Sequence, residues 1–483
     1  MLEGYCWPQS ALPGEEIALH VSSTGPFGVE VAREGGDRVT VWRADAVAGS
    51  EHPIPVTASA DGCGWPATIT ILVGEDWRSG YYAVTLSSGE ERADLFFVVR
   101  PHRDPSPILL VLATATYNAY NDWGGPSLYT GGTRVSFARP LPRGFLAKPE
   151  PAVRKAQALP DREALGYFAW AEEKGLSPWS GGSGWWTWER PFVAWAEREG
   201  SVIDVATSQD LERHPEVLDD HRLFLSVGHD EYWSWGMRDA VEGFIADGGN
   251  AAFFSGNTCW WQVRLEDHAM TCFKYRADED PVLGTADRHL LTGAWADRRI
   301  ARPEASMTGM SFSRGGYSRY GLGVPRASGA YTVWRPDHWA FEGTGLRYGD
   351  ALGLPDSIVG YEVDGCELAM TDGLPVPTHM DGAPDTLEVL ATAPAKLWSQ
   401  DEQPSRYAHE PGELEHVAMV LFGDDWQHQI HRIAHNHAVV GCFGLPGGGT
   451  VFNAGCTDWT YGIAGNDPDV VRITRNVLDR LST

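Results

Sequence analysis

The sequence predicts an α/β protein that begins with an all-β domain. Residues 1–100 consist of short runs of alternating or β-rich residues, whereas after residue 107 continuous apolar stretches alternate with runs at helical spacing. The segment between them, "RPHRDPSP", has three prolines in eight residues and is typical of a linker. With 483 residues the chain also exceeds what one hydrophobic core usually organises. We therefore expect two domains, at 1–100 and 107–483.

The front domain is expected to be a β-sandwich. Gly, Pro, Asp and Ser turns separate its apolar runs, among them "EIALHVSS", "RVTVWRA", "YYAVTLSS" and "DLFFVVRP". Short strands at this spacing, with turn residues between them, are typical of two packed antiparallel sheets.

The second domain is expected to be doubly wound. The run "ILLVLATAT" at 108–116 is continuously apolar, as in a strand buried on both faces of a parallel sheet. A helix over "ERPFVAWAEREG" should end near Gly200, and strands follow at "SVIDVATS", "LFLSVG" and "NAAFFSGN". Between the last two, "SWGMRDAVEGFIADGG" predicts a helix with Ser234 as N-cap and one apolar face, made by Met237, Val241, Phe244 and Ile245.

Residues of about 285–420 interrupt this alternation. They are rich in turns, as in "RGGYSRYGLG" and "PVPTHMDGAPD", and we expect a β-rich insertion there. The α/β pattern returns in "VVGCFGLPGGGTVFNAGCTDW" and in the last helix, "DPDVVRITRNVLDRL". In a doubly wound domain, ligands bind beyond the carboxyl ends of the strands.

Composition restricts the partners. A formal net charge of -27 argues against binding nucleic acid or an anionic membrane, because there would be no counterion release to drive it. No apolar run of about 18 residues and no signal-like start is present, so we expect a cytoplasmic protein. Seven cysteines without a CxxC pair predict neither a disulfide framework nor a thiolate zinc site. Many of the 21 tryptophans lie beside glycine, which favours either an aromatic-walled pocket or plain core packing.

The stretch "SVGHDEYWS" places three titratable residues at a predicted strand end. Residues i and i+2 share a face of an extended chain, so His229 and Glu231 form the natural pair, and Asp230 points away. A carboxylate is a hard metal ligand or a general base, and a neighbouring imidazole can steer a water molecule. The alternative is a structural cluster in which a carboxylate caps the following helix.

Tyrosines follow the first predicted strand of the α/β domain, at Tyr117, Tyr120 and Tyr129. Because a phenol normally has a pKa near 10, a phenolate ligand requires a strongly Lewis-acidic ion such as ferric iron. Alternatively, these rings wall a pocket. A third strand end places Asn257 either to bind a substrate carbonyl or nitrogen, or in a plain turn.

A rival metal site is given by His428, His431 and His435. Their spacing of i, i+3 and i+7 would place them on one face of a helix, where two imidazoles could bind zinc; the alternative is a solvated face. No GxSxG elbow, phosphate loop or GxGxxG is present, which disfavours serine hydrolases and nucleotide binding.

Several strings together resemble one known family. They are "QSALPGEEI", "GCGWP" and "DWRSGYYAV" in the front domain, and "AYNDWGGPSLY", "SVGHDEYWS", "GGNAAFFSGNT" and "GGGTVFNAGCTDW" behind it. The chain resembles the N,N-dimethylformamidase large (beta) subunit family over nearly its whole length. The resemblance implies an immunoglobulin-like β domain, followed by an α/β domain related to class I glutamine amidotransferases without their cysteine nucleophile. It also implies hydrolysis of a small amide with one iron ion, held by two tyrosines and a glutamate.

Carried over by motif, Glu231 is the glutamate ligand, and His229, Glu231 and Asn257 are the catalytic residues. Tyr120 is the first choice for a tyrosine ligand and Tyr129 the second, with Tyr117 and Tyr167 as alternatives. The resemblance further implies a small partner subunit, and it leaves a homo-oligomer open.

The function expected is therefore metal-dependent hydrolysis of a small amide or a related C–N bond, with a mononuclear ferric ion (Fe3+) activating water and carbonyl. Two alternatives are kept: a non-catalytic small-molecule-binding protein with an aromatic pocket, and a zinc hydrolase that uses His428, His431 and His435.

Overall fold

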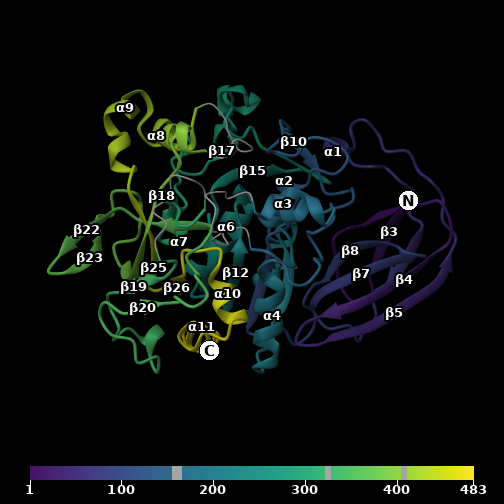
Figure 1. Ribbon diagram of the computed structural model, residues 1–483, viewed down its shortest axis with the longest axis horizontal. Helices are drawn as coiled ribbons and strands as arrows, with labels where there is room; N and C mark the ends of the chain where they lie inside the picture. The colour runs from purple at the N-terminus through teal and green to yellow at the C-terminus, as the bar shows by residue number, and fades with distance from the viewer. Residues whose placement is uncertain (155–165, 321–327, 404–410) are drawn as a thin grey trace. The chain divides into compact units, whose positions relative to one another are not determined.

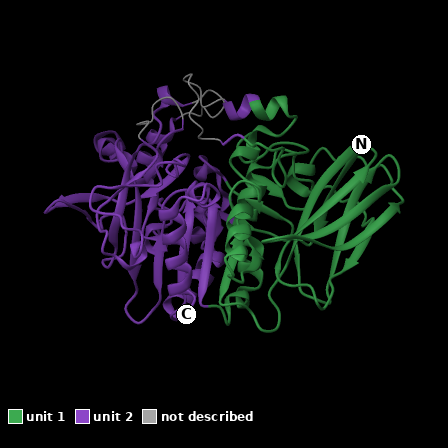
Figure 2. Ribbon diagram, turned by 60° about the horizontal axis from the view of Figure 1, so that its bottom comes forward, with its two compact units in different colours: residues 1–152, 170–221, 264–272 green, residues 153–169, 222–263, 273–483 purple. Residues whose placement is uncertain are grey.

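A computed structural model describes residues 1–154, 166–320, 328–403 and 411–483. The chain divides into two compact units, each of which joins segments that are far apart in the sequence (Figure 2). Unit 1 comprises Met1–Ala152, Trp170–His221 and Arg264–Cys272; unit 2 comprises Val153–Ala169, Arg222–Val263 and Phe273–Thr483.

Unit 1 begins with two sheets (Figure 1). The smaller one has the order β1 (Leu2–Trp7), β3 (Glu16–Ser23) and β6 (Ile69–Leu72). The larger has the order β2 (Ser10–Ala11), β8 (Glu91–Val99), β7 (Gly80–Ser88), β4 (Phe27–Glu34) and β5 (Arg38–Val47). A short helix, α1 (Ala58–Asp61), precedes β6. The strands predicted in the front domain are confirmed, and β1 and β2 are strands that the pattern did not reveal.

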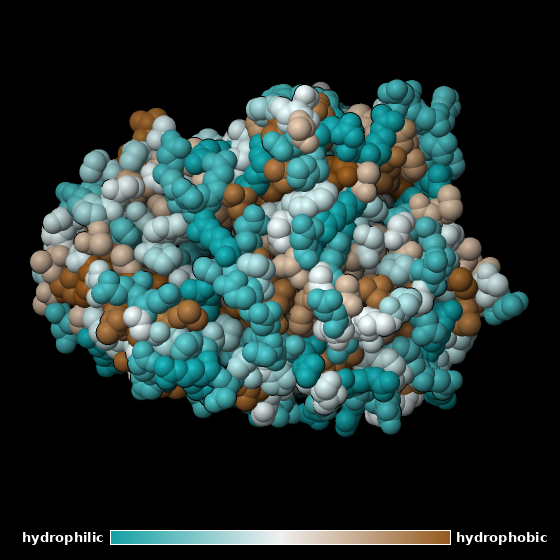
Figure 3. Space-filling model, turned by 180° about the vertical axis from the view of Figure 1, so that it is seen from behind, coloured by the Kyte–Doolittle hydropathy of each residue, from teal (hydrophilic) through white to brown (hydrophobic). Residues whose placement is uncertain are grey.

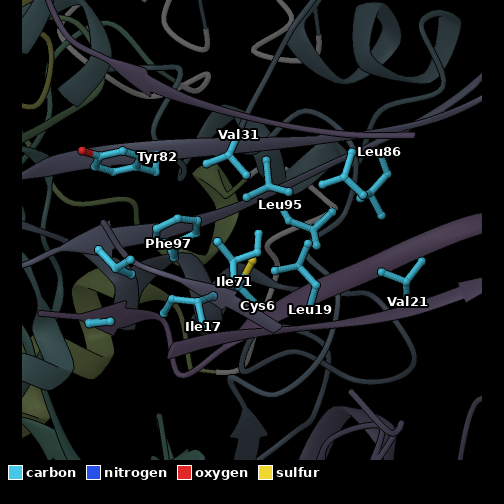
Figure 4. Close-up of a cluster of buried hydrophobic side chains, with 14 of the residues drawn as sticks. Cys6, Ile17, Leu19, Val21, Val31, Ile71, Tyr82, Leu86, Leu95 and Phe97 are labelled. Atoms are coloured by element: carbon cyan, nitrogen blue, oxygen red, sulfur yellow. The ribbon is translucent and has the colours of Figure 1, made fainter. Parts of the chain in front are cut away.

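The inward residues of the two sheets form one hydrophobic core (Figure 4). Ile17 and Leu19 of β3 meet Val31 of β4 and Leu95 and Phe97 of β8, and each is at most 3% exposed. Because the side chains of a strand alternate between its faces, every second residue enters this core. Burying one such side chain contributes about 1.5–3 kcal/mol relative to exposure.

The rest of unit 1 contains the first α/β elements. Strands β9 (Ile108–Leu112) and β11 (Asp204–Thr207) pair in parallel. The strand predicted over 108–116 is too long, because the chain turns into the helix α2 (Thr114–Tyr120), all of whose residues are buried. Burial there outweighs the β propensity of the threonines. Its other helices and strands include α4 (Glu189–Arg198), α5 (Ser208–Arg213), β10 (Arg134–Ser136), β16 (Ala269–Thr271) and the second half of α3 (Gly166–Glu173).

A partly buried ion pair joins the front β-sheets to helix α4 within unit 1. The Arg33 Nη2 atom lies 2.5 Å from Glu197 Oε1, and the backbone N–H of Gly36 donates to Glu197 Oε2 at 2.8 Å. Burial raises the pKa of Glu197, but hydrogen bonds from Arg33 and Gly36 and the Arg33 charge outweigh it, so the pKa is lowered overall. The ion pair of Arg33 and Glu197 therefore holds the front β-sheets against helix α4.

Replacing Glu197 by Gln is expected to lower the free energy of unfolding at pH 7 by about 2 kcal/mol, because Arg33 loses its counter-charge in a partly buried position. A lowered folded-state pKa stabilises the protein above the unfolded pKa of about 4.3, and this contribution is lost as the pH falls through the folded pKa. Denaturant unfolding should show the difference from wild type at pH 7 and its decline below about pH 4.5. The control Glu30→Gln, which removes a more exposed partner of Arg38, should cost less than about 1 kcal/mol. An equal cost for both variants would contradict this role of the ion pair.

Unit 2 is built on a mixed sheet. Strands β12 (Leu223–His229), β14 (Asn250–Gly256) and β26 (Thr450–Asn453) are parallel neighbours in that order. The sheet then continues in antiparallel fashion through β25 (Asn436–Gly444), β24 (Glu388–Ala395), β19 (Tyr331–Val333) and β20 (Ala351–Leu352). The parallel neighbours β12, β14 and β26 are of the kind expected in a doubly wound domain, whereas the β25–β26 hairpin joins antiparallel strands and makes the sheet mixed.

Helices predicted from the sequence are present in unit 2. Helix α6 (Trp235–Ala246) begins after Ser234, whose side chain accepts a hydrogen bond from the Met237 N–H, and its buried face includes Val241 and Ile245. The last helix is α11 (Pro468–Leu481), preceded by α10 (Trp459–Ala464). The N-cap and the apolar face of α6 could both be predicted from local spacing.

Residues 285–420 contribute β19, β20 and β24 to the main sheet. The region also forms an antiparallel pair, β18 (Ser311–Tyr317) with β21 (Glu362–Gly365), and a hairpin, β22 (Leu368–Thr371) with β23 (Leu374–Pro377). Its other elements are β17 (Gly293–Ala294), α7 (Ala305–Thr308) and α8 (Glu413–Phe422). β13 (Tyr232–Ser234) pairs in parallel with β15 (Trp261–Leu265).

The surface of the protein is mainly polar on the face that Figure 3 shows, with hydrophobic residues scattered over it. All seven cysteines are free and buried, as expected of small hydrophobic side chains. Within the described ranges, every helix is too short or too polar to cross a membrane.

Candidate active site

Two parallel strand ends in unit 2 bring the predicted residues together. His229 is the last residue of β12, and its register partner in β14 is Gly256, which precedes Asn257. Backbone from β21 approaches closely here, because a Cβ on Gly256 would lie 2.5 Å from the Glu362 carbonyl oxygen. Only glycine fits this position. The expected position at the carboxyl ends of the strands is therefore confirmed for His229 and Asn257.

The three titratable residues of "HDE" divide as predicted. His229 Nε2 lies 3.4 Å from Glu231 Oε2, whereas Asp230 turns the other way and accepts a hydrogen bond from Ser226 Oγ at 2.8 Å. Burial raises the pKa of Asp230 to about 6, although hydrogen bonds from Ser226 and Trp233 oppose it. Ser234 caps helix α6, so neither carboxylate is needed for that structural role.

A second glutamate completes the cluster, and the sequence analysis missed it. Glu362 Oε2 lies 2.6 Å from His229 Nε2 and accepts a hydrogen bond from Asn257 Nδ2 at 3.1 Å. Glu362, like His229 and Glu231, is at most 3% exposed. The imidazole therefore lies between two buried carboxylates, an arrangement that can accept and hold a proton.

The other oxygen of Glu231 faces donors. Trp261 Nε1 donates to Glu231 Oε1 at 2.7 Å, and Lys274 Nζ lies 3.7 Å from the same oxygen. Lys274 also donates to the Tyr232 hydroxyl at 2.9 Å and is only 5% exposed. Since burying an unpaired ammonium is very costly, the glutamate is the natural counter-charge of this lysine.

Asp364, two residues after Glu362 in β21, fixes the turn that carries Asn257. Its carboxylate accepts the backbone N–H groups of Asn257 and Thr258 at 2.9 and 3.0 Å, and Asn257 adopts a φ of 52°. Burial raises the pKa of Asp364 to about 7, and the nearby Glu362 also raises it, against those hydrogen bonds. Among the described residues Asn257 Oδ1 has no hydrogen-bond partner, so it is an acceptor for a water or a substrate donor.

The two preferred tyrosines form a pair in unit 1. The hydroxyl of Tyr129, beyond the end of α2, donates to the hydroxyl of Tyr120 on that helix at 2.7 Å, and Trp179 packs against both rings. Tyr117 instead donates to the buried Glu189 at 2.7 Å. Tyr167 belongs to unit 2. Of the four candidate phenols, the structure brings Tyr120 and Tyr129 together.

The spacing of these two oxygens fits a shared cation. Two oxygen ligands about 2.0 Å from one ion and at right angles lie about 2.8 Å apart, close to the 2.7 Å between the two hydroxyls. In the described ranges, no group of three or more His, Cys, Asp or Glu side chains is arranged to hold a metal ion.

The histidine-rich segment is not the helix that was predicted. Helix α9 (Trp426–Gln429) ends before His431, a 3-10 turn covers Ile430–Arg432, and β25 begins at Asn436. His428, His431 and His435 therefore do not share a helical face, and His428 is an exposed partner of Asp425. The run "NHAVVGCF" is drawn into the sheet by its β-branched and buried residues. This removes the basis for the zinc alternative.

Aromatic residues lie around the cluster. Trp261 contacts Glu231, whereas Trp233 donates to the Asp230 carbonyl oxygen and lies in the core. A second aromatic group comes from residues 285–420 and is anchored by Tyr361, whose ring lies 5.8 Å from that of His229. Its other members are Tyr317, Tyr320 and Trp398.

Comparison with known proteins shows which family the chain belongs to. A family model described as N,N-dimethylformamidase beta subunit-like, C-terminal, matches residues 29–470. The chain belongs to this family. The resemblance noted in the sequence is thereby confirmed.

Two relatives within the N,N-dimethylformamidase beta subunit-like family are similar at low identity. The N,N-dimethylformamidase beta subunit of Alcaligenes sp is 24% identical over 451 residues, which is 87% of this chain and 54% of that protein. The corresponding subunit of Paracoccus aminophilus is 25% identical over 453 residues, 86% of this chain and 54% of that protein. The chain thus spans about half the length of the curated relatives it matches.

Proposed function

We propose that this protein hydrolyses a small amide at the cluster of His229, Glu231 and Glu362. Membership of the N,N-dimethylformamidase beta subunit-like family and the names of the two relatives support the reaction class. The observation that carries the proposal is the 2.6 Å contact of His229 with Glu362, within a buried cluster at a strand end. Such a pair is suited to general base catalysis.

Each residue of the cluster has a separate role in the proposed reaction. Water must lose a proton to attack an amide carbonyl carbon, and the His229–Glu362 pair is placed to accept that proton. Asn257 Oδ1 would accept a hydrogen bond from the water and orient it, because Asn257 Nδ2 is occupied by Glu362. Tyr361 and the rings beside it would exclude bulk water from the reaction.

We also propose that Tyr120, Tyr129 and Glu231 hold a mononuclear ferric ion, as the family resemblance implies. The 2.7 Å spacing of the two phenols supports their sharing one hard cation. When bound, such an ion supplies Lewis acidity toward a carbonyl oxygen and a water molecule.

Elemental analysis and an absorption spectrum of the purified protein test the metal. We expect about one iron per chain and a visible band, because phenolate-to-ferric charge transfer absorbs visible light. Tyr129→Phe should lose or shift this band, and the control Tyr117→Phe should keep it, since Tyr117 is bonded to Glu189. A colourless, iron-free protein that hydrolyses amides would refute the metal.

A panel of small amides tests the reaction itself. Turnover of at least one amide by the iron-loaded protein is expected. If the protein binds amides and turns none of them over, the alternative of a non-catalytic binding protein with an aromatic pocket is favoured instead.

Both relatives are named beta subunits. We therefore include a partner subunit in the proposal. Light scattering of the protein, alone and after co-expression with a candidate small subunit, distinguishes a hetero-oligomer from a homo-oligomer.

A further inference from the structure

A third buried carboxyl group lies beside the cluster and has no part in the reaction described above. Glu413 is the first residue of helix α8 and is 7% exposed. Its Oε2 accepts a hydrogen bond from the Tyr317 hydroxyl at 3.1 Å. Its Oε1 is buried and has no hydrogen-bond partner among the described residues. Buried polar atoms without a partner are rare and call for an explanation.

Strand pairing shows that Glu413 lies near Glu362. Tyr317 in β18 is the register partner of Glu362 in β21, so their side chains leave the same face of this strand pair. Tyr317, which holds Glu413, therefore lies beside the glutamate that binds His229.

A second contact from helix α8 agrees with this position. The ring of His416, one turn after Glu413, lies 6.0 Å from that of Trp261 and 4.9 Å from that of Tyr275. Trp261 is the indole that donates to Glu231. The first turn of α8 therefore contacts Tyr317, which lies beside Glu362, and Trp261, which binds Glu231.

The surroundings keep a proton on Glu413. Burial and, less strongly, the charges of Glu362 and Glu231 raise its pKa, the Tyr317 hydrogen bond and the Lys274 charge oppose them, and the net result is a pKa of about 8. At pH 7 Glu413 is therefore mainly a neutral acid. Beside it, the His229–Glu362 pair is the proposed proton acceptor, so the site already has a group that takes a proton.

We propose that Glu413 is the acid that protonates the leaving nitrogen, an inference that rests on the proposed amide hydrolysis. The water oxygen bonds to the carbonyl carbon, and the water proton passes to the His229–Glu362 pair. The C–N bond then breaks, its electron pair moves to nitrogen, and nitrogen takes the proton from Glu413. The proton on the His229–Glu362 pair returns to Glu413 through solvent after the acid and the amine leave.

Leaving-group chemistry provides the test. An amine cannot leave as an anion, whereas 4-nitrophenolate leaves without being protonated. We expect Glu413→Gln to lower kcat/KM by at least about 100-fold for a small N-alkyl formamide, and by less than about fivefold for 4-nitrophenyl formate. Glu415→Gln, on the same helix, is the matched control and should change neither reaction by more than about twofold.

Each outcome decides the inference. If Glu413→Gln loses the amide and the ester reactions equally, Glu413 is a structural residue and the assignment is overturned. If Glu413→Gln hydrolyses the amide within tenfold of wild type, another donor such as Lys274 protonates the leaving nitrogen and the assignment is likewise overturned. If Glu413→Gln does not fold, Glu413→Asp, which keeps the proton at a shorter reach, should still impair the amide more than the ester. A wild-type protein that hydrolyses neither compound would refute the proposed function itself.

Discussion

Replacing Glu231 by Gln is expected to abolish amide hydrolysis and iron binding together. We expect kcat/KM to fall by at least about 1,000-fold, because the change removes a proposed ligand and the carboxylate beside His229. It also leaves Lys274, which is 5% exposed, without this counter-charge. Iron per chain and kcat/KM should be measured on the same preparation.

The neighbouring variant Asp230→Asn is the matched control for Glu231. Asp230 accepts its hydrogen bond from Ser226 and does not face His229 or Glu362. Iron content and turnover should therefore stay near wild type. Retention of both iron and turnover by Glu231→Gln would refute the proposed metal site and leave only the architecture.

Replacing Glu362 by Gln is expected to separate catalysis from iron binding. We expect kcat to fall by about 100- to 1,000-fold, because His229 loses the carboxylate 2.6 Å away that supports its role as a base. Iron content should stay near one per chain, since Glu362 is not among the proposed ligands. The measurement is kcat with saturating amide, alongside iron analysis.

The control for Glu362 is Glu367→Gln, a glutamate just beyond β21 that pairs with Arg314 and Arg432. It should leave both quantities close to wild type. If Glu362→Gln loses its iron while Glu367→Gln keeps it, Glu362 is itself a ligand, and the assignment of Tyr120, Tyr129 and Glu231 must be revised.

Local patterns predicted the parts of the fold that depend on neighbours in the chain. The N-cap at Ser234 and the buried face of α6 follow from spacings of three and four residues, and the strands of the front domain from alternation. The pairing of His229 with Glu231 follows from the two-residue repeat of an extended chain. Local patterns failed where burial reversed them, as in helix α2 after Leu112 and in the strand that contains Asn436.

Residues far apart in the sequence completed the site. Glu362 reaches His229 from a strand more than a hundred positions later, and Glu413 comes from the start of a helix beyond it. The string "YEVDG" could have indicated that Glu362 belongs to the site, because Glu362 and Asp364 are two carboxylates on one face of a buried strand. Nothing in the local sequence around Lys274 or Glu413 indicates which residues they contact.

The sequence by itself determined which side chains leave the strand ends, because backbone geometry fixes the direction of residues i and i+2 within one strand. Only the tertiary structure decided which carboxyl groups meet His229 and which tyrosines pair. Those contacts depend on the order and direction of strands that are distant in the chain, and burial selects that order through the whole core rather than through any one segment.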